Sequence, residues 1–185
     1  MSTTSTDFEL ISRVEQFYYR EARLLDERCL QQWLALVDES IEYSMPTRYV
    51  PQPDREMQDT EAFLSVDREL ERSEGGKGSP LRQDGYLQTL VRTIRPFKAN
   101  AWAESPPPRT RRFISNVEVA AVNDDEYRVH SNFQLFYSHN GADNHTYTGG
   151  RRDVLKEIDG QFKLFRREII IDWDIITGPT LALIF

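Results

Sequence analysis

The chain has 185 residues, of which 39% are apolar and 11% aromatic, which is enough to bury one core of ordinary size in a single domain over residues 1–185. Its formal charge of −7 argues against a nucleic acid or an anionic membrane as partner, because those surfaces favour clustered Lys and Arg. We expect no secretory leader and no membrane-spanning segment, and the single cysteine, Cys29, fits a reducing compartment, so we expect a cytoplasmic protein.

The first part of the chain, from Thr6 to Val37, predicts two consecutive amphipathic helices after a flexible terminus over residues 1–6. The apolar stripe of the first helix consists of Leu10, Val14, Phe17, Tyr18, Leu24 and Leu25. Glu21 lies within this stripe, where a carboxylate is either a structural ion pair with an arginine or a pocket acid. Asp26 is a candidate N-cap of the second helix. The inner side of that helix is expected to contain Leu30, Trp33, Leu34 and Val37.

The next segment predicts a short strand followed by a long irregular stretch. Apolar and polar residues alternate over residues 41–45, which indicates a strand that Pro46 ends. Prolines in residues 49–54 predict an exposed crossing, and residues 61–78 favour a short helix or turn. The glycines of residues 73–80 lack the spacing of a phosphate-binding loop, so we expect a mobile loop there.

A third helix is predicted over residues 84–94, before Pro96. It has apolar residues at helical spacing, namely Leu87, Leu90, Val91 and Ile94. The prolines that follow predict a stiff, extended connector over residues 101–108.

The last third of the chain reads as four long strands joined by hairpins. They are expected over residues 112–122, 127–137, 147–158 and 162–171. Gly149 and Gly150 predict a bulge or bend, and Asp159 with Gly160 predicts a tight turn. Extended strands of this length must twist and coil.

The end of the chain is unusually apolar. The run Ile169 to Ile171 is apolar on both faces, which predicts burial on both sides of its strand. The segment Leu181 to Phe185 must also be covered by this fold or by a neighbour, and we expect a partner subunit to cover it.

The residues that bind metals are scarce. Iron–sulfur clusters and structural zinc sites need several cysteines or Cys/His pairs, and the chain has one Cys. Its three histidines, His130, His139 and His145, do not have the spacing of a helical ligand pair. We therefore expect no metal and no cofactor on this chain.

Six strings, in order along the chain, resemble one protein family. They are YREARLLDE at 19–27, WLAL at 33–36, IEYSMP at 41–46, AWAESPP at 101–107, RTRRFISNV at 109–117 and GRRDVL at 150–155. Together they resemble the small (beta) subunit of aromatic-ring-hydroxylating dioxygenases over nearly the whole chain. Residues 56–80 contain no such string, and residues 172–174 differ from the expected pattern.

The resemblance implies an α+β fold of the nuclear transport factor 2-like type, a cone of strongly curved antiparallel or mixed sheet wrapped around N-terminal helices. It also implies a division of labour in an enzyme that adds O₂ to an aromatic ring with electrons relayed from NADH. A larger (alpha) subunit would hold a Rieske [2Fe-2S] cluster and a mononuclear Fe(II), and three large and three small subunits would assemble. Ferredoxin and reductase components would reach this chain only through the large subunit.

The resemblance also directs attention to subunit interfaces. The arginines of the two basic strings are expected to pair with acidic residues, either within the cone or across a subunit boundary. The interface candidates are Arg109, Arg111, Arg112, Arg151, Arg152, Trp173, Leu183 and Phe185.

A rival hypothesis comes from enzymes that share this fold. Some are dehydratases, isomerases or cyclases that use a Tyr/His/Asp set in the cone, and here that set would be Asp26, Tyr43 and His130. Each has a simpler explanation: Asp26 as a cap, Tyr43 as core, and His130 on the strand face opposite Val129. An adaptor domain without an enzyme partner is a third alternative.

Overall fold

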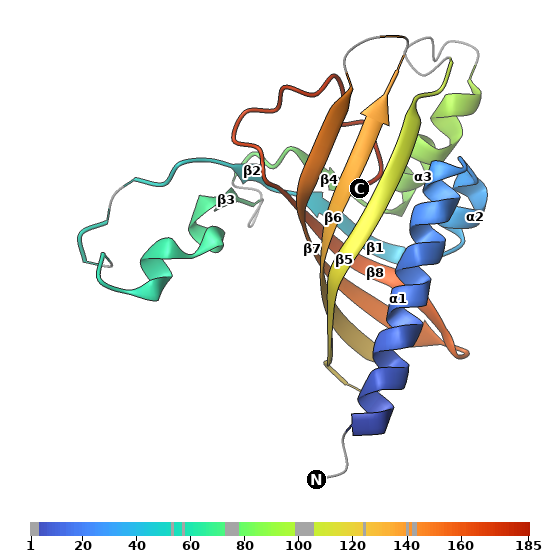
Figure 1. Ribbon diagram of the computed structural model, residues 1–185, viewed down its shortest axis with the longest axis horizontal. Helices are drawn as coiled ribbons and strands as arrows, with labels where there is room; N and C mark the ends of the chain where they lie inside the picture. Colours follow the sequence, from blue (N-terminus) through green and yellow to red (C-terminus); the bar gives the residue numbers. More distant parts are fainter. Residues whose placement is uncertain are drawn as a thin grey trace.

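The computed structural model of the protein describes residues 4–52, 54–56, 58–72, 78–98, 106–123, 125–139, 141 and 144–185. A six-stranded sheet curls around the long first helix (Figure 1). Its strands are β1 (Val37–Met45), β4 (Arg82–Asp84), β5 (Arg109–Ala121), β6 (Glu126–Ser138), β7 (His145–Ile158) and β8 (Gln161–Ile171). Their order across the sheet is β4-β1-β8-β7-β6-β5. Neighbouring strands are antiparallel except β1 and β8, which are parallel, so the sheet is mixed as predicted.

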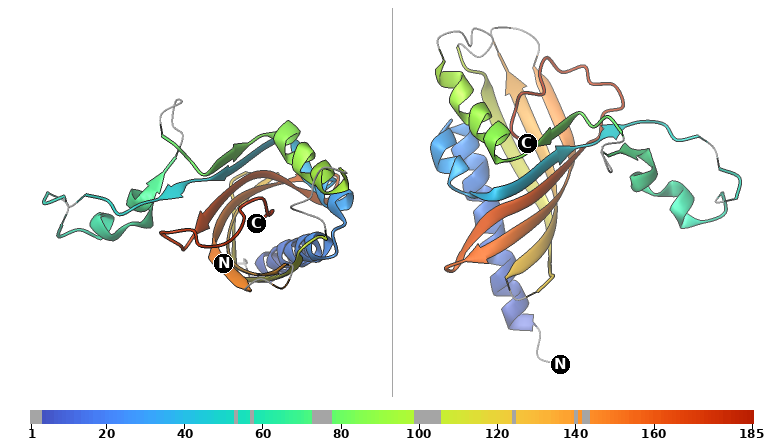
Figure 2. Two further views of the ribbon diagram at one scale, coloured as in Figure 1. Left: turned by 90° about the horizontal axis from the view of Figure 1, so that it is seen from above. Right: turned by 180° about the vertical axis from the view of Figure 1, so that it is seen from behind.

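The four hairpin-connected strands of the last third are confirmed. Side chains in β6 alternate between buried and exposed along nearly its whole length, which is the pattern of a strand with one face on a core. The turn between β7 and β8 contains Asp159 and Gly160 with φ angles of 51° and 73°, the left-handed conformations that a two-residue hairpin turn needs. Strands this long coil strongly, and the left view of Figure 2 shows them curving around the first helix.

The bulge expected at Gly149 and Gly150 is not there. Both glycines pair in continuous register with β6 and β8, and the shift between β7 and β8 lies between Val154 and Leu155. Gly149 is instead required by close packing, because a Cβ on it would lie 2.1 Å from the backbone oxygen of Ile170.

The helical start of the chain is confirmed in type but not in its boundaries. Helix α1 (Thr4–Asp26) buries the predicted stripe, and α2 (Leu30–Leu34) is a single short turn-and-a-half preceded by Cys29. Asp26 is therefore not its N-cap, and Val37 belongs to β1 rather than to the inner side of a helix. The carboxylate of Asp26 binds β5 instead, a long-range contact that local sequence does not reveal.

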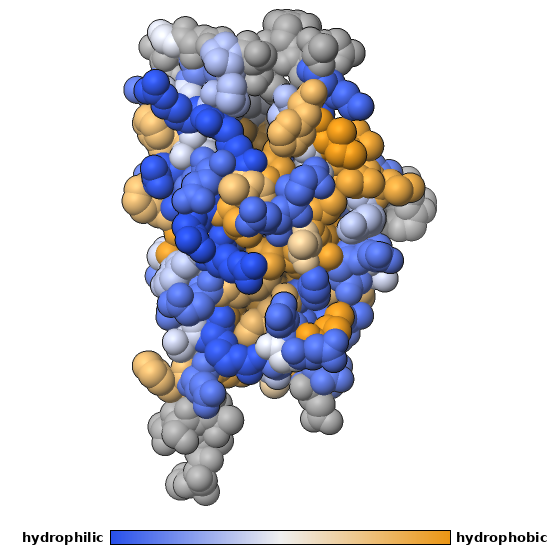
Figure 3. Space-filling view, turned by 90° about the vertical axis from the view of Figure 1, so that its right-hand side faces the viewer, coloured by the Kyte–Doolittle hydropathy of each residue, from blue (hydrophilic) through white to orange (hydrophobic). Residues whose placement is uncertain are grey.

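The third helix, α3 (Tyr86–Ile94), begins two residues later than expected because residues 82–84 pair with β1 as strand β4. It continues into the 3-10 turn η3 (Arg95–Phe97). Its inner side contains Thr89 and Thr93, whereas Leu87 is 72% and Val91 62% exposed. Figure 3 views the helical side of the molecule and shows apolar surface gathered in its upper part.

Residues 47–52, 54–56 and 58–72 form an arm that stands away from the sheet (Figures 1 and 2). The arm begins with β2 (Thr47–Arg48), runs through 3-10 turns η1 (Glu61–Leu64) and η2 (Val66–Glu69), and returns as β3 (Leu70–Glu71), which pairs with β2. The exposed crossing and the short helical turns are as predicted. Residues 73–77 of the predicted mobile loop and 101–105 of the predicted connector lie outside the described residues.

One apolar core fills the space between α1 and the concave face of the sheet. Val14 and Tyr18 of α1, Val129 and Leu135 of β6, and Leu155 of β7 are all completely buried in it. Burying one such side chain stabilises the fold by about 1.5–3 kcal/mol, so the predicted stripe holds α1 on the sheet. Among the described residues, no helix is long and apolar enough to cross a membrane.

Candidate functional site

Four charged side chains meet inside the cone and form what we call the charge cluster: Glu21, Arg151, Asp153 and Arg167. Arg167 contacts Glu21 at 2.7 Å and Asp153 at 2.7 Å, and Arg151 contacts Glu21 at 3.2 Å. Each side chain is at most 1% exposed. Two carboxylates face two guanidinium groups, so the cluster is neutral overall, as buried charges must be. Of the two readings of Glu21, the structure shows the ion pair.

Neutral side chains complete the hydrogen bonding of the cluster. Tyr18 donates to Asp153 over 2.8 Å, and the indole of Trp33 donates to Glu21 over 3.1 Å. Burial alone raises the pKa of Glu21, but the charges of Arg167 and Arg151 outweigh it and lower that pKa to about 2. Burial and the charge of Asp153 raise the pKa of Tyr18 well above its ordinary value. At physiological pH Glu21 is thus ionised and Tyr18 neutral.

The end of segment 181–185 lies in the same interior, where side chains of other elements form hydrogen bonds with its backbone. Arg112 donates to the carbonyl of Ile184 over 2.6 Å, and Arg167 donates to that of Phe185 over 3.0 Å. The N–H of Phe185 donates to the hydroxyl of Tyr43 over 3.0 Å, and its completely buried ring packs on Phe133. The expectation that a partner subunit covers this end is therefore wrong for Ile184 and Phe185: the fold covers them itself.

Asp26 joins the end of α1 to the start of β5. Its carboxylate accepts from the backbone N–H of Arg112 over 2.8 Å and from the hydroxyl of Thr110 over 3.0 Å, and it also pairs with the Arg112 guanidinium. Both side chains of the pair are at most 5% exposed. Asp26 is therefore fully engaged in structure.

The three residues of the rival catalytic set are not brought together. Asp26 and Tyr43 lie on the concave side, each bonded to structural partners. His130 is exposed on the other face of the sheet, opposite in parity to the buried Val129, as its spacing predicted.

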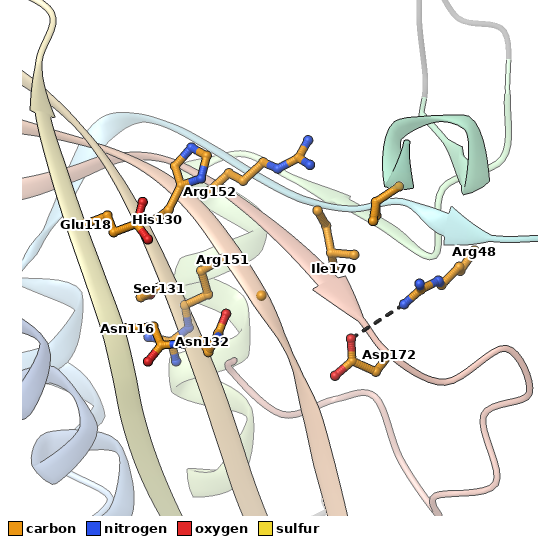
Figure 4. Close-up of a pocket in the computed structure, with 12 residues that line it drawn as sticks. Arg48, Asn116, Glu118, His130, Ser131, Asn132, Arg151, Arg152, Ile170 and Asp172 are labelled. Carbon is orange, nitrogen blue, oxygen red and sulfur yellow. Dashed lines mark hydrogen bonds and ion pairs between the residues drawn. The ribbon is translucent and has the colours of Figure 1, made fainter. Parts of the chain in front are cut away.

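His130 instead borders a cavity of about 340 Å³ on the outer face of the sheet. Glu118 and Arg152, which also line it, are the Cα partners of His130 on the neighbouring strands (Figure 4). Arg48 and Asp172, 3.5 Å apart, close the cavity on the side of the arm. Polar side chains surround this space, but among the described residues no group of three or more His, Cys, Asp or Glu is placed to hold a metal.

The interface candidates differ in how far this single chain buries them. Arg112 and Arg151 are buried with partners in the same chain, so of the two alternatives the structure shows the internal pair for them. Arg152 is partly exposed and binds Asp67 and Glu168, which ties the arm to the sheet. Within a single chain, the remaining candidates divide into the exposed Arg109 and Arg111, the partly buried Trp173 and Leu183, and the buried Phe185. The rings of Trp173 and Tyr147 stack with their centroids 4.9 Å apart. A role of these residues at a subunit boundary stays a prediction.

Sequence reasoning missed Asp153 and Arg167. Asp153 has the same parity as Tyr147, Arg151 and Leu155, all of which point inward, so strand alternation could have found it. Arg167 gave no such signal, because Phe165 is skipped in the pairing of β7 with β8 and the parity of β8 changes there.

Comparison with known proteins decides the family. The sequence model described as ring hydroxylating beta subunit matches residues 20–178. The chain belongs to this family. The beta subunit of benzene 1,2-dioxygenase from Pseudomonas putida is 32% identical over 180 residues, covering 96% of this chain and 89% of the relative. Membership implies a large alpha subunit as the partner of this beta subunit.

Solved structures show that the beta subunit has the predicted fold. A naphthalene 1,2-dioxygenase chain superposes with a TM-score of 0.79 at 23% identity, covering 98% of this chain and 88% of that one. The benzoate 1,2-dioxygenase beta subunit from Burkholderia mallei gives 0.65 at 19% identity, covering 92% and 95%. A scytalone dehydratase-type protein from Novosphingobium aromaticivorans gives 0.60 at 19% identity, covering 95% and 94%. The fold is therefore the nuclear transport factor 2-like cone, which does not by itself determine function.

Proposed function

We propose that this beta subunit is the non-catalytic assembly subunit of a dioxygenase that adds both atoms of O₂ to an aromatic ring. The proposal depends most on one observation: the interior of the cone is occupied by the chain itself. Phe185, Tyr43 and the charge cluster fill the space, and their polar groups bond to one another. In the part of the chain that the structure describes, segment 181–185 therefore occupies the space that a substrate inside the cone would need.

The redox chemistry belongs, in this proposal, to the alpha subunit, which would hold a Rieske [2Fe-2S] cluster and a mononuclear Fe(II). Three alpha and three beta subunits would assemble, and ferredoxin and reductase components would deliver electrons from NADH to the alpha subunit. The exposed apolar side chains of α3, Leu87 and Val91, support a partner-covered surface, because contiguous exposed apolar groups on a subunit mark contacts with other chains.

Activity of the separated and combined subunits tests this proposal. The beta subunit is purified alone and co-purified with its alpha subunit, and arene-dependent O₂ consumption is measured with reductase, ferredoxin and NADH. We expect no turnover by the beta subunit alone and activity from the complex. O₂ consumption by the isolated beta subunit would contradict the proposal.

Two variants separate structural from catalytic roles. His130→Ala and Tyr43→Phe in the beta subunit should leave kcat of the complex within about twofold, because neither side chain would touch the substrate. Thermal unfolding of each variant serves as the control for folding. A loss of 100-fold or more in kcat, in a complex that assembles and unfolds normally, would show that the beta subunit takes part in the chemistry.

A further inference from the structure

The base of the arm is tied to the sheet by ion pairs. Arg152 binds Asp67 at 2.6 Å, and Arg72 binds Asp67 at 2.7 Å and Glu168 at 3.0 Å. Hydrogen bonds from Arg152 and Arg72 lower the pKa of Asp67, so its charge is retained. Two elements of the sheet thus anchor the base of the arm, while the rest extends away from the body (Figures 1 and 2).

The outer part of the arm is acidic and apolar at once. Residues 50–72 contain seven acidic and three basic side chains. The acidic residues Glu56, Asp59 and Glu61 are exposed there, next to Leu64 at 78% exposure. Val50 and Val66, 80% and 39% exposed, are further large apolar side chains that the single chain leaves uncovered on the arm.

A surface of the opposite charge lies on the outer face of β5 and β6. Because Arg112 points into the cone, its neighbours Arg111 and Phe113 point outward, and Phe113 is 57% exposed. Phe136, 36% exposed, is the Cα partner of Arg111 on β6. Among the described residues neither Arg109 nor Arg111 has an acidic partner, although the chain as a whole has a charge of −7. We call these residues, Arg109, Arg111, Phe113 and Phe136, the β5–β6 face.

We propose that the arm of one copy of this chain docks on the β5–β6 face of a second copy. The charges are complementary, acidic on the arm and basic on the face, and each side offers apolar side chains, Leu64 on one and Phe113 with Phe136 on the other. The two surfaces are different parts of one molecule, so the contact is head to tail, and it forms a closed ring where the rotation between copies allows closure. This deepens the proposed function, on which it rests, by naming the surfaces through which three beta subunits associate.

Charge reversal tests the contact in the full-length chain. Arg109→Glu with Arg111→Glu on the face, or Asp59→Lys with Glu61→Lys on the arm, should weaken self-association about tenfold or more in sedimentation velocity. When both sets are combined in one chain, the charges are again opposite, so most of the lost self-association should return. Arg128→Glu, on the same outer face of β6 but outside the contact, is the matched control and should sediment as wild type. A monomeric wild-type chain, or reversal sets that leave sedimentation unchanged, would overturn the proposal.

Cross-linking separates this contact from binding of the alpha subunit. In a Cys29→Ser background, Leu64→Cys and Phe113→Cys are introduced in separate chains, mixed and oxidised within the assembled complex. We expect a disulfide between two beta subunits. A cross-link from Leu64→Cys to the alpha subunit would overturn the proposal while leaving the assembly role intact. If the wild-type chain did not bind the alpha subunit at all, the proposed function itself would be contradicted.

Discussion

Glu21 and Arg167 form a two-point ion pair at the centre of the cone, with Oε1 2.7 Å and Oε2 3.0 Å from the two guanidinium nitrogens. The pair connects the first helix to the last strand of the sheet, and neither side chain is more than 1% exposed. Because the planar guanidinium also binds Asp153 along its other edge, one arginine sets the distance between α1, β7 and β8.

Removing one partner of this pair should be costly. Glu21→Ala leaves the charges of Arg167 and Arg151 buried with one carboxylate fewer, and we expect a loss of about 3–5 kcal/mol in the free energy of unfolding. Urea unfolding followed by circular dichroism measures it. The matched control is Glu42→Ala, which removes the partner of Arg166 in a pair whose side chains are 64% and 51% exposed, and should cost at most about 1 kcal/mol. Equal losses for the two variants would contradict the role assigned to burial.

The same carboxylate should make the protein sensitive to acid. The pKa of Glu21 is about 2 in the fold and 4.5 when unperturbed, so its contribution to stability is complete above about pH 4.5 and disappears as pH falls toward 2. The difference corresponds to roughly 3 kcal/mol. Urea midpoints measured from pH 6 down to pH 3 should fall more steeply for wild type than for Glu21→Gln, which has no proton to gain. Parallel curves for the two proteins would refute this source of the acid effect.

Much of the fold could be predicted because its strands are long and regular. Alternation in residues 127–137 and 147–158 gave the right strands within two residues, since each has one face on the core. Glu21 in an apolar stripe correctly indicated an ion pair. The identity of its main partner could not be read, because the parity change at Phe165 turns Arg167 inward where strict alternation would place it outside.

Long-range relations account for the remaining differences. Asp26 looks like a helix cap in local sequence, but its partner Arg112 is 86 residues away. An apolar segment such as 181–185 must be covered, yet sequence alone does not distinguish an inward path from an intersubunit one. The structure takes the inward path because Arg112, Arg167 and Tyr43 supply partners for its backbone.

Gly149 and Gly150, which are adjacent in β7, should respond very differently to substitution by alanine. A Cβ on Gly149 would lie 2.1 Å from the backbone oxygen of Ile170, which cannot move without breaking the β7–β8 ladder, whereas one on Gly150 would have its nearest neighbours at 3.9 Å. We expect Gly149→Ala to lower the free energy of unfolding by about 2–3 kcal/mol or to prevent folding, and Gly150→Ala to change it by less than about 1 kcal/mol. Thermal unfolding compares the two. Gly150→Ala serves as the control for β7, and similar melting temperatures would show that β7 and β8 separate readily at this point.

Phe185 should stabilise the single chain rather than only its assembly. Its ring is completely buried and packs on Phe133 at 5.7 Å and Tyr147 at 5.4 Å between centroids, so Phe185→Ala would leave a cavity that costs about 3–5 kcal/mol. The free energy of unfolding is measured in urea at a protein concentration low enough for the chain to be monomeric. Ile175→Ala is the control, because Ile175 is 78% exposed and its removal should change stability by less than about 0.5 kcal/mol. If Phe185→Ala instead weakened association with the alpha subunit while the monomer kept its full stability, the ring would have to lie at a subunit boundary, and the inward path of segment 181–185 would be wrong.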